Sequence, residues 1–190
     1  MNDAEYPKAV LVRGVPGGGK SQLTDILRQK LGARVEVLDP DAVDQDSGEY
    51  RAFVETQTRE GVDPKLHLYR WSRARAYAAI EAHKIIIWNQ AFTNLEIFRK
   101  MIDRLETHAA ACGTKLPILV VEVEVDPQTA RQRVAERVNR GGHTVSEEAF
   151  ARIFNDYKSF VDEGLTVVKV DGRADINSSV TTVLDAIQTM

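Results

Sequence analysis

Cysteine is nearly absent from this sequence, since Cys112 is the only one in 190 residues. A single thiol excludes an intramolecular disulfide bond and a metal site built from several cysteines. Cys112 directly follows three alanines, residues 109–111, in a segment of helical character. This context predicts a cysteine that packs against its neighbours rather than one that reacts.

Long hydrophobic runs are also missing. The longest, such as residues 116–121, fall far short of the roughly 20 apolar residues that a membrane-spanning helix needs. The first eight residues include Asp3, Glu5 and Pro7, which is unlike the basic and then apolar start of a secretory signal. We therefore expect a cytoplasmic protein that does not enter a membrane.

Neither sign of charge prevails, because 25 Lys and Arg residues face 28 Asp and Glu residues, for a formal net charge of -3. This balance argues against a protein that coats nucleic acids, although it leaves room for a local basic site. The sequence has no internal repeat and no long linker, and 43% of its residues are hydrophobic. We predict one domain with one substantial core.

Short apolar runs alternate with segments of helical periodicity. The runs at residues 9–12, 35–38, 85–88, 118–125 and 165–170 predict a parallel sheet of about five strands in a three-layer α/β/α fold. Their consecutive apolar residues are typical of strands covered by helices on both faces. In such a sheet, ligands bind at the carboxyl ends of the strands.

The strongest motif follows the first of these runs. Residues 14–21 form a complete phosphate-binding loop of the Gly-x-x-x-x-Gly-Lys-Ser type, and a predicted helix from Gln22 follows. This motif predicts a P-loop NTPase fold. We predict that the nucleotide is bound by Gly14, Val15, Pro16, Gly17, Gly18, Gly19, Lys20, Ser21 and Gln22. Lys20 would contact the terminal phosphates in catalysis, and Ser21 would bind Mg²⁺.

Two carboxylates follow the second run, in the sequence Asp39-Pro40-Asp41. Beside a phosphate loop, a carboxylate can accept the proton of an attacking hydroxyl group, and a second one can hold Mg²⁺. We assign Asp41 as the catalytic base and Asp39 to the metal and the substrate. Asp-Pro-Asp is also good turn and helix-cap chemistry, so Asp41 could cap the next helix while Asp39 only makes the turn.

Polar residues follow the third run, where motor ATPases carry an Asp-Glu pair. Asn89 and Thr93 are candidate substrate-binding residues, and Asn94 is expected to cap a helix over residues 95–111. The missing carboxylates argue against a motor or switch ATPase. Gln90 keeps that alternative open, because a glutamine can orient a water molecule.

Between the second and third runs lies a long insertion, residues 45–83, whose second half is basic and helical. Arg70, Arg73 and Tyr77 share one helical face, and we predict that the two arginines bind an anionic substrate. The alternative is a solvated basic face, with Leu68, Trp71 and Ala78 turned to the core.

A second arginine-rich helix begins after the fourth run. Arg133 and Arg137 lie one turn apart ahead of Gly141-Gly142, and mobile arginines of this kind can close over a phosphoryl group. We predict a helical lid at residues 131–146 with both arginines catalytic. Arg173, after the last run, is a candidate contact to the nucleotide base. The predicted domain spans residues 1–190, with 45–83 on the substrate side.

These motifs resemble the small P-loop kinases that include zeta-toxin-like proteins and the kinase domain of phage polynucleotide kinase. The resemblance rests on residues 14–21, on Asp39-Pro40-Asp41, and on residues 133–138 followed by Gly141-Gly142-His143-Thr144-Val145. It implies that Asp41 is the base that activates the acceptor hydroxyl group. It also implies that Arg133 and Arg137 lie over the phosphates.

The chain departs from both groups at substrate-side positions. Asp44 stands where polynucleotide kinases carry an arginine, and Asn89-Gln90 stand where zeta-like kinases carry an acid-Thr pair. We expect an ATP- and Mg²⁺-dependent kinase whose acceptor is a hydroxyl group of a small anionic metabolite or nucleotide sugar. The alternatives are a kinase of nucleic-acid 5′-hydroxyl ends and, from another class, a nucleotide-controlled interaction module without transfer activity.

Overall fold

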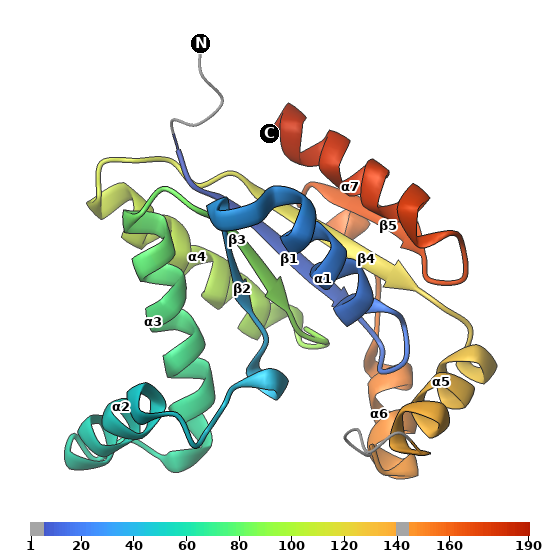
Figure 1. The fold of residues 1–190 in the computed structure, drawn as a ribbon, viewed down its shortest axis with the longest axis horizontal. Coiled ribbons are helices and arrows are strands. Elements are labelled where there is room, and N and C mark those ends of the chain that lie inside the picture. Colours follow the sequence, from blue (N-terminus) through green and yellow to red (C-terminus); the bar gives the residue numbers. More distant parts are fainter. Residues whose placement is uncertain (1–5, 140–144) are drawn as a thin grey trace.

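The computed structural model describes residues 6–139 and 145–190. Its centre is a five-stranded parallel sheet with strand order β2-β3-β1-β4-β5 (Figure 1). The strands are β1 Lys8–Gly14, β2 Val35–Leu38, β3 Ile85–Asn89, β4 Ile118–Glu124 and β5 Val167–Asp171. The predicted parallel sheet is therefore confirmed, and each observed strand overlaps one of the five predicted runs.

Helices cover both faces of this sheet (Figure 1). They are α1 Lys20–Leu31, α2 Gly48–Arg59, α3 His67–Glu81, α4 Leu95–Ala111, α5 Pro127–Asn139, α6 Glu147–Asp156 and α7 Ile176–Thr189. One core cluster joins the sheet to α1 and α7, and the other joins it to α3 and α4. The three layers predicted from the sequence are present, as in P-loop NTPases.

Strand β1 shows why its apolar residues run consecutively. Its seven residues are all buried. Val10 and Val12 belong to the cluster with α1 and α7, whereas Ala9 and Leu11 belong to the cluster with α3 and α4. Because successive side chains of a strand point to opposite faces, a strand between two helical layers needs apolar residues at every position.

Helices α5 and α6 project beyond the carboxyl ends of the strands (Figure 1). They pack around a small third cluster formed by Val15, Ala130, Val134 and Phe150. Val15 belongs to the phosphate loop, so this cluster ties the predicted lid to that loop. The remaining lid residues of the prediction, 140–144 with its glycine pair, lie outside the described residues.

A buried ion pair lies at the base of this projection. Arg13 of β1 and Glu122 of β4 are both fully buried, with Nη1 and Oε1 2.5 Å apart. Arg13 also donates to the backbone oxygens of Phe92 and Lys158, and its guanidinium group lies 3.4 Å from the ring centroid of Phe160. The pair thus joins two strands to the loop after β3 and to the segment after α6.

Two local features bear on the sequence predictions. Asn94 caps α4, as predicted, since its side chain accepts a hydrogen bond from the backbone of Ile97. Cys112 is exposed, so the prediction that it packs was wrong. It follows the last residue of α4 at the open end of the helix, where the alanine context does not bury it.

The second half of the insertion is helical, as predicted, although its inward face differs from the alternative considered above. Within α3 the buried residues are His67, Ser72, Ala76, Ala79 and Ile80, and Ala78 is exposed. In the part of the chain that the structure describes, no helix combines the length and the apolar character required to cross a bilayer.

Candidate functional site

The phosphate loop connects β1 to α1 and is held by close backbone packing. Gly17 and Gly19 have positive φ angles of 78° and 103°, which L-residues with side chains rarely adopt. A Cβ atom at Gly17 would also collide with the backbone oxygen of Ala130 in α5. The loop can therefore turn its backbone N–H groups inward only if these positions remain glycine.

Lys20 lies at the N-terminus of α1 and is half-buried. Its Nζ donates to the backbone oxygen of Val15 at 3.0 Å. The pKa of Lys20 is lowered to about 8, chiefly by burial and also by nearby Arg137, against the carboxylates of Asp39 and Asp41, which raise it. A cation held under these conditions gains from an anionic ligand, which a phosphate group would supply.

Asn89 joins three elements at the carboxyl edge of the sheet. It is the last residue of β3 and is 4% exposed. Its Nδ2 donates to Asp39 Oδ2 at 2.7 Å and to Ser21 Oγ at 3.2 Å. Asn89 Oδ1 is buried and has no hydrogen-bond partner among the described residues. The amide therefore holds the carboxylate and the hydroxyl group side by side.

The groups around Asn89 fit a magnesium ion. The Ser21 hydroxyl, the Asp39 carboxylate and the orphaned Asn89 oxygen are hard oxygen donors, which Mg²⁺ prefers. Ser21 and Asp39 would hold the ion, which when bound neutralises phosphate charge.

The two acids after β2 have different surroundings. Asp39 caps the short 3-10 helix Pro40–Ala42, and its Oδ1 accepts from the backbone N–H of Asp41 at 3.0 Å. The capping residue is thus Asp39. The alternative considered from the sequence, in which Asp41 is the cap, was wrong. Burial raises the pKa of Asp39, although its hydrogen bonds oppose this shift. The Asp41 side chain is exposed and does not make the cap.

The arginines of α5 differ in their contacts. Arg133 Nη1 donates to the backbone oxygen of Gly172 at 2.8 Å and reaches that of Gly17 at 3.5 Å. Arg137 is exposed, and it is close enough to lower the pKa of Lys20. Arg131 instead pairs with Glu147 of α6 at 2.7 Å. Two of the three guanidinium groups therefore lie on the phosphate-loop side of the helix.

One hollow, of about 260 Å³, opens beside the phosphate loop. It is lined by Gly18, Gly19, Gln22, Leu23, Val123, Arg133, Val170, Asp171, Gly172, Ala174, Asp175, Ile176 and Ser179. The predicted base contact Arg173 is exposed and paired with Asp171 and Asp126, and it does not line this hollow. The α7 residues of this lining could not be predicted from the sequence, because they reach the phosphate loop only through the folding of the chain.

A second hollow, of about 330 Å³, lies beside the carboxylates. It is lined by Arg28, Glu36, Val37, Leu38, Asp39, Ala42, Val43, Asp44, Ser47, Glu49, Trp71, Ser72 and Arg75. The α3 helix thus contributes Trp71 and Arg75 to it. The predicted Arg70 donates to Gln57 of α2, and Arg73 does not line this hollow. Thr93 is half-buried after β3.

Comparison with known proteins identifies relatives of the fold. The model of a family described as an AAA domain matches residues 10–159. A gluconokinase from Sinorhizobium meliloti 1021 aligns with a TM-score of 0.59 and 14% identity, covering 97% of this chain and 94% of that chain. No curated protein matches the sequence.

Two further solved structures have the same fold. A sugar kinase from Janibacter sp. HTCC2649 has a TM-score of 0.58 and 16% identity, covering 94% of this chain and 93% of that chain. Deoxyadenosine kinase from M. mycoides, with bound dATP, has a TM-score of 0.56 and 15% identity, covering 94% of this chain and 98% of that chain. At these identities the likeness concerns the fold.

Proposed function

The chain belongs to the AAA domain family, and from that premise we propose that it is an ATP- and Mg²⁺-dependent kinase. It would move the γ-phosphate of ATP to a hydroxyl group of a small anionic metabolite or a nucleotide sugar. Kinases among its structural neighbours, at low identity, agree with this class of reaction. The lid and carboxylate motifs favour a placement near the zeta-toxin-like group.

The observation that carries the proposal is the pair of hollows that meet the phosphate loop and its carboxylates. Gly18 and Gly19 line the first, and Asp39 lines the second. Asn89 links Asp39 to Ser21, the residue after the loop lysine. A hydrolase needs only the nucleotide compartment and a water, whereas a kinase needs a second compartment for the acceptor.

The residues around the loop would divide the chemistry between them. Lys20 and Ser21 bind the phosphates and the metal, and Asp39 completes the metal site. Asp41 is exposed and close enough to Lys20 to raise its pKa, and it lies next to the lining of the second hollow rather than in it. In this proposal Asp41 accepts the proton of an acceptor hydroxyl group that extends from the hollow toward Lys20. Arg133 and Arg137 stabilise charge on the transferred phosphoryl group and help to exclude water.

The second hollow supports a small acceptor. Its volume is at the lower end for ligand pockets. Arg28 and Arg75 are its cationic residues, and Trp71 supplies an aromatic face. Arg75 is paired with Glu36 and Glu49, so an anionic group of the acceptor would bind there by displacing these carboxylates. Asp39 and Asp44 supply acceptors for hydroxyl groups. A nucleotide sugar would extend beyond this hollow, so the smaller metabolites are our first choice.

The test is a transfer screen with γ-labelled ATP and Mg²⁺. Pools of phosphorylated sugars, sugar acids, nucleotide sugars and 5′-hydroxyl oligonucleotides are incubated with the protein, with the Lys20→Ala variant as the blank. Labelled product from a metabolite pool supports the proposal. Product from oligonucleotides alone would instead support a polynucleotide kinase. Tight ATP binding without product in any pool would support an interaction module.

A further inference from the structure

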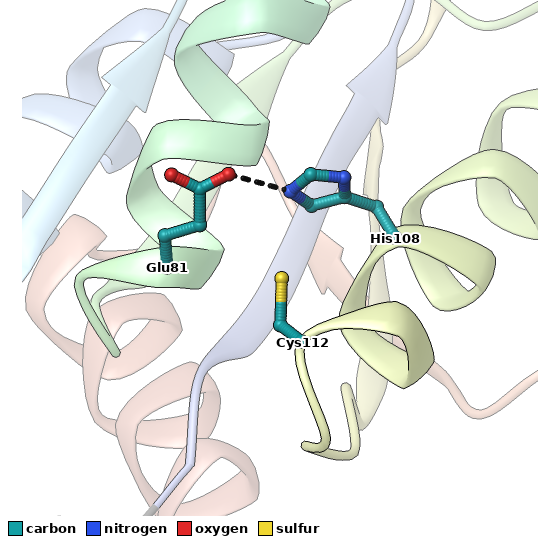
Figure 2. A group of neighbouring side chains, drawn as sticks. All are labelled: Glu81, His108 and Cys112. Atoms are coloured by element: carbon teal, nitrogen blue, oxygen red, sulfur yellow. Dashed lines mark hydrogen bonds and ion pairs between the residues drawn. The ribbon is translucent and has the colours of Figure 1, made fainter.

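At the edge of the sheet opposite the phosphate loop, three potential metal ligands converge. Figure 2 shows Glu81 from the end of α3 facing His108 and Cys112 from the end of α4. One carboxylate oxygen, one imidazole nitrogen and the Sγ atom all lie within 4.8 Å of one another. Glu81 Oε1 and His108 Nε2 are 3.0 Å apart. A shared cation would replace the hydrogen bond between Glu81 and His108 and would draw the sulfur inward.

The ligands are placed by the ends of two helices. His108 and Cys112 are four residues apart, so they lie one turn apart on the same side of α4. The backbone N–H of Cys112 donates to the His108 oxygen at 3.0 Å, which continues the helical geometry to the cysteine. The C-termini of both helices carry partial negative charge, which favours a cation.

The imidazole ring is also held in place. Tyr77, one turn before Glu81 on α3, stacks on His108 with ring centroids 3.9 Å apart and planes 10° apart. The same two residues border a surface hollow of about 320 Å³. His108 is half-buried, whereas Glu81 and Cys112 are exposed. The site is therefore partly ordered by packing and still open to solvent.

We propose that Glu81, His108 and Cys112 form a zinc site that clamps α3 to α4, with the fourth position taken by water. Zinc binds thiolate, imidazole and carboxylate ligands in tetrahedral geometry, whereas Mg²⁺ and Ca²⁺ prefer oxygen ligands alone. On binding, the thiol releases its proton to solvent, and the sulfur donates its electron pair to the metal. The site is separate from the phosphate-loop carboxylates and does not depend on the proposed kinase activity.

The single cysteine makes the test direct, because every thiol signal comes from Cys112. The full chain is titrated with Zn²⁺ in excess Mg²⁺, which competes for the oxygen ligands of the proposed phosphate-loop site. The rate at which a disulfide reagent modifies the thiol is measured at each zinc concentration. We expect stoichiometric zinc to slow modification strongly, and a chelator to restore it. With Co²⁺ as the probe, a thiolate-to-cobalt absorption band should appear with the visible bands of tetrahedral cobalt.

Variants identify the ligands. Glu81→Gln and His108→Ala should each weaken zinc affinity by about 100-fold or more. Loss of a residue that only hydrogen-bonds to a metal ligand typically weakens affinity by about 10- to 100-fold, and loss of a ligand should cost at least as much. Cys112→Ser should lose the thiolate band and the rise in melting temperature that zinc produces in the parent. Glu106→Gln removes an exposed carboxylate from the same helix as a matched control and should bind like the parent.

Two results would overturn the proposal. The first is a thiol whose modification rate ignores zinc. The second is zinc affinity and thiol protection that persist in both Glu81→Gln and His108→Ala, which would place the metal elsewhere. Circular dichroism of each apo variant separates loss of metal binding from loss of the fold.

Discussion

The nucleotide side and the acceptor side of the proposed active site are built in different ways. On the nucleotide side, backbone packs against backbone: a Cβ atom at Gly17 would meet Ala130, and one at Gly172 would meet Gly18. On the acceptor side, partly exposed side chains pair with each other, as Arg75 does with Glu36 at 2.5 Å and with Glu49 at 3.6 Å. The close-packed backbone of the nucleotide side tolerates few substitutions, whereas the ion-paired side chains of the acceptor side can be replaced.

This contrast indicates where the chemistry and the specificity reside. A close-packed backbone loop recognises what all nucleotides share, namely phosphate. Ion pairs at the surface contribute little to stability, so the pair of Arg75 with the exposed Glu49 can be exchanged at small cost. We therefore expect substitutions on the nucleotide side to abolish activity, and substitutions on the acceptor side to alter substrate choice.

The largest effect is expected for Lys20→Ala. Lys20 contacts the phosphate loop and not the core, so its loss should abolish transfer and weaken ATP binding while the protein stays folded. Nucleotide titration and thermal unfolding measure the two properties. A variant that bound Mg-ATP as tightly as the parent and still turned over would show that the loop does not act as assigned.

Arg133→Ala and Arg137→Ala should lower single-turnover transfer by about 10³-fold, as loss of an arginine that acts on transition-state charge does, with smaller changes in ATP affinity. Arg131 is a poor control because it pairs with Glu147. The exposed Arg34, in the turn after α1, is a better one. If both α5 variants transferred phosphate at the parental rate, the two arginines would have no catalytic role and α5 would be an ordinary solvated helix.

The two acids should separate by mechanism. Asp41→Asn should lower transfer by roughly 10²-fold or more at nearly normal ATP affinity, because a general base acts mainly in the transition state. Asp39→Asn should instead raise the Mg²⁺ concentration that transfer requires, since Asp39 is held beside Ser21. Rates measured against Mg²⁺ concentration decide, and the reverse pattern would exchange the two roles.

A moderate effect is expected from pH. The pKa of Lys20 is lowered to about 8, so the apo protein loses this charge as the pH rises through about 8. ATP affinity should fall above that pH in the parent but not in Lys20→Arg, whose guanidinium group stays charged. Between pH 8 and the ordinary lysine value, the unfolded chain binds more protons, so apo stability should rise with pH. A flat affinity profile in the parent would contradict the burial of this charge.

The smallest effect on stability is expected for Arg75→Gln. Its ion pairs are partly exposed and are worth about 0 to 1 kcal/mol. The KM for the acceptor should nevertheless rise, with kcat nearly unchanged, if Arg75 binds the acceptor's anionic group. Arg73→Gln, outside the hollow, serves as the comparison. An effect confined to Arg73→Gln would favour the basic face that the sequence indicated.

The fold was predictable because its signals are local. The glycines of the phosphate loop and the consecutive apolar residues of β1 follow from backbone conformation and burial at neighbouring positions. The cap at Asn94 follows for the same reason. Which segments are strands and which are helices could therefore be predicted without knowledge of distant contacts.

The parts of the candidate site that were not predicted depend on distant contacts. Asn89 was predicted as a substrate-binding residue, but its hydrogen bonds to Asp39 and Ser21, which lie 50 and 68 positions away, were not predicted. The α7 residues reach the nucleotide hollow only because β5 lies beside β4. Exposure of Cys112 depends on where α4 ends against α3, and three alanines do not specify that position.

The buried pair of Arg13 and Glu122 limits how this protein can be altered. Removing either partner leaves a lone charge in the core, which typically costs about 3 to 5 kcal/mol, whereas exchanging both for apolar residues of similar volume is often neutral or better. A single replacement at either position is therefore expected to destabilise the protein, whereas the double replacement is expected to be tolerated. A library that varies single residues will record both as intolerant, and only paired replacement will tell whether the charges themselves matter.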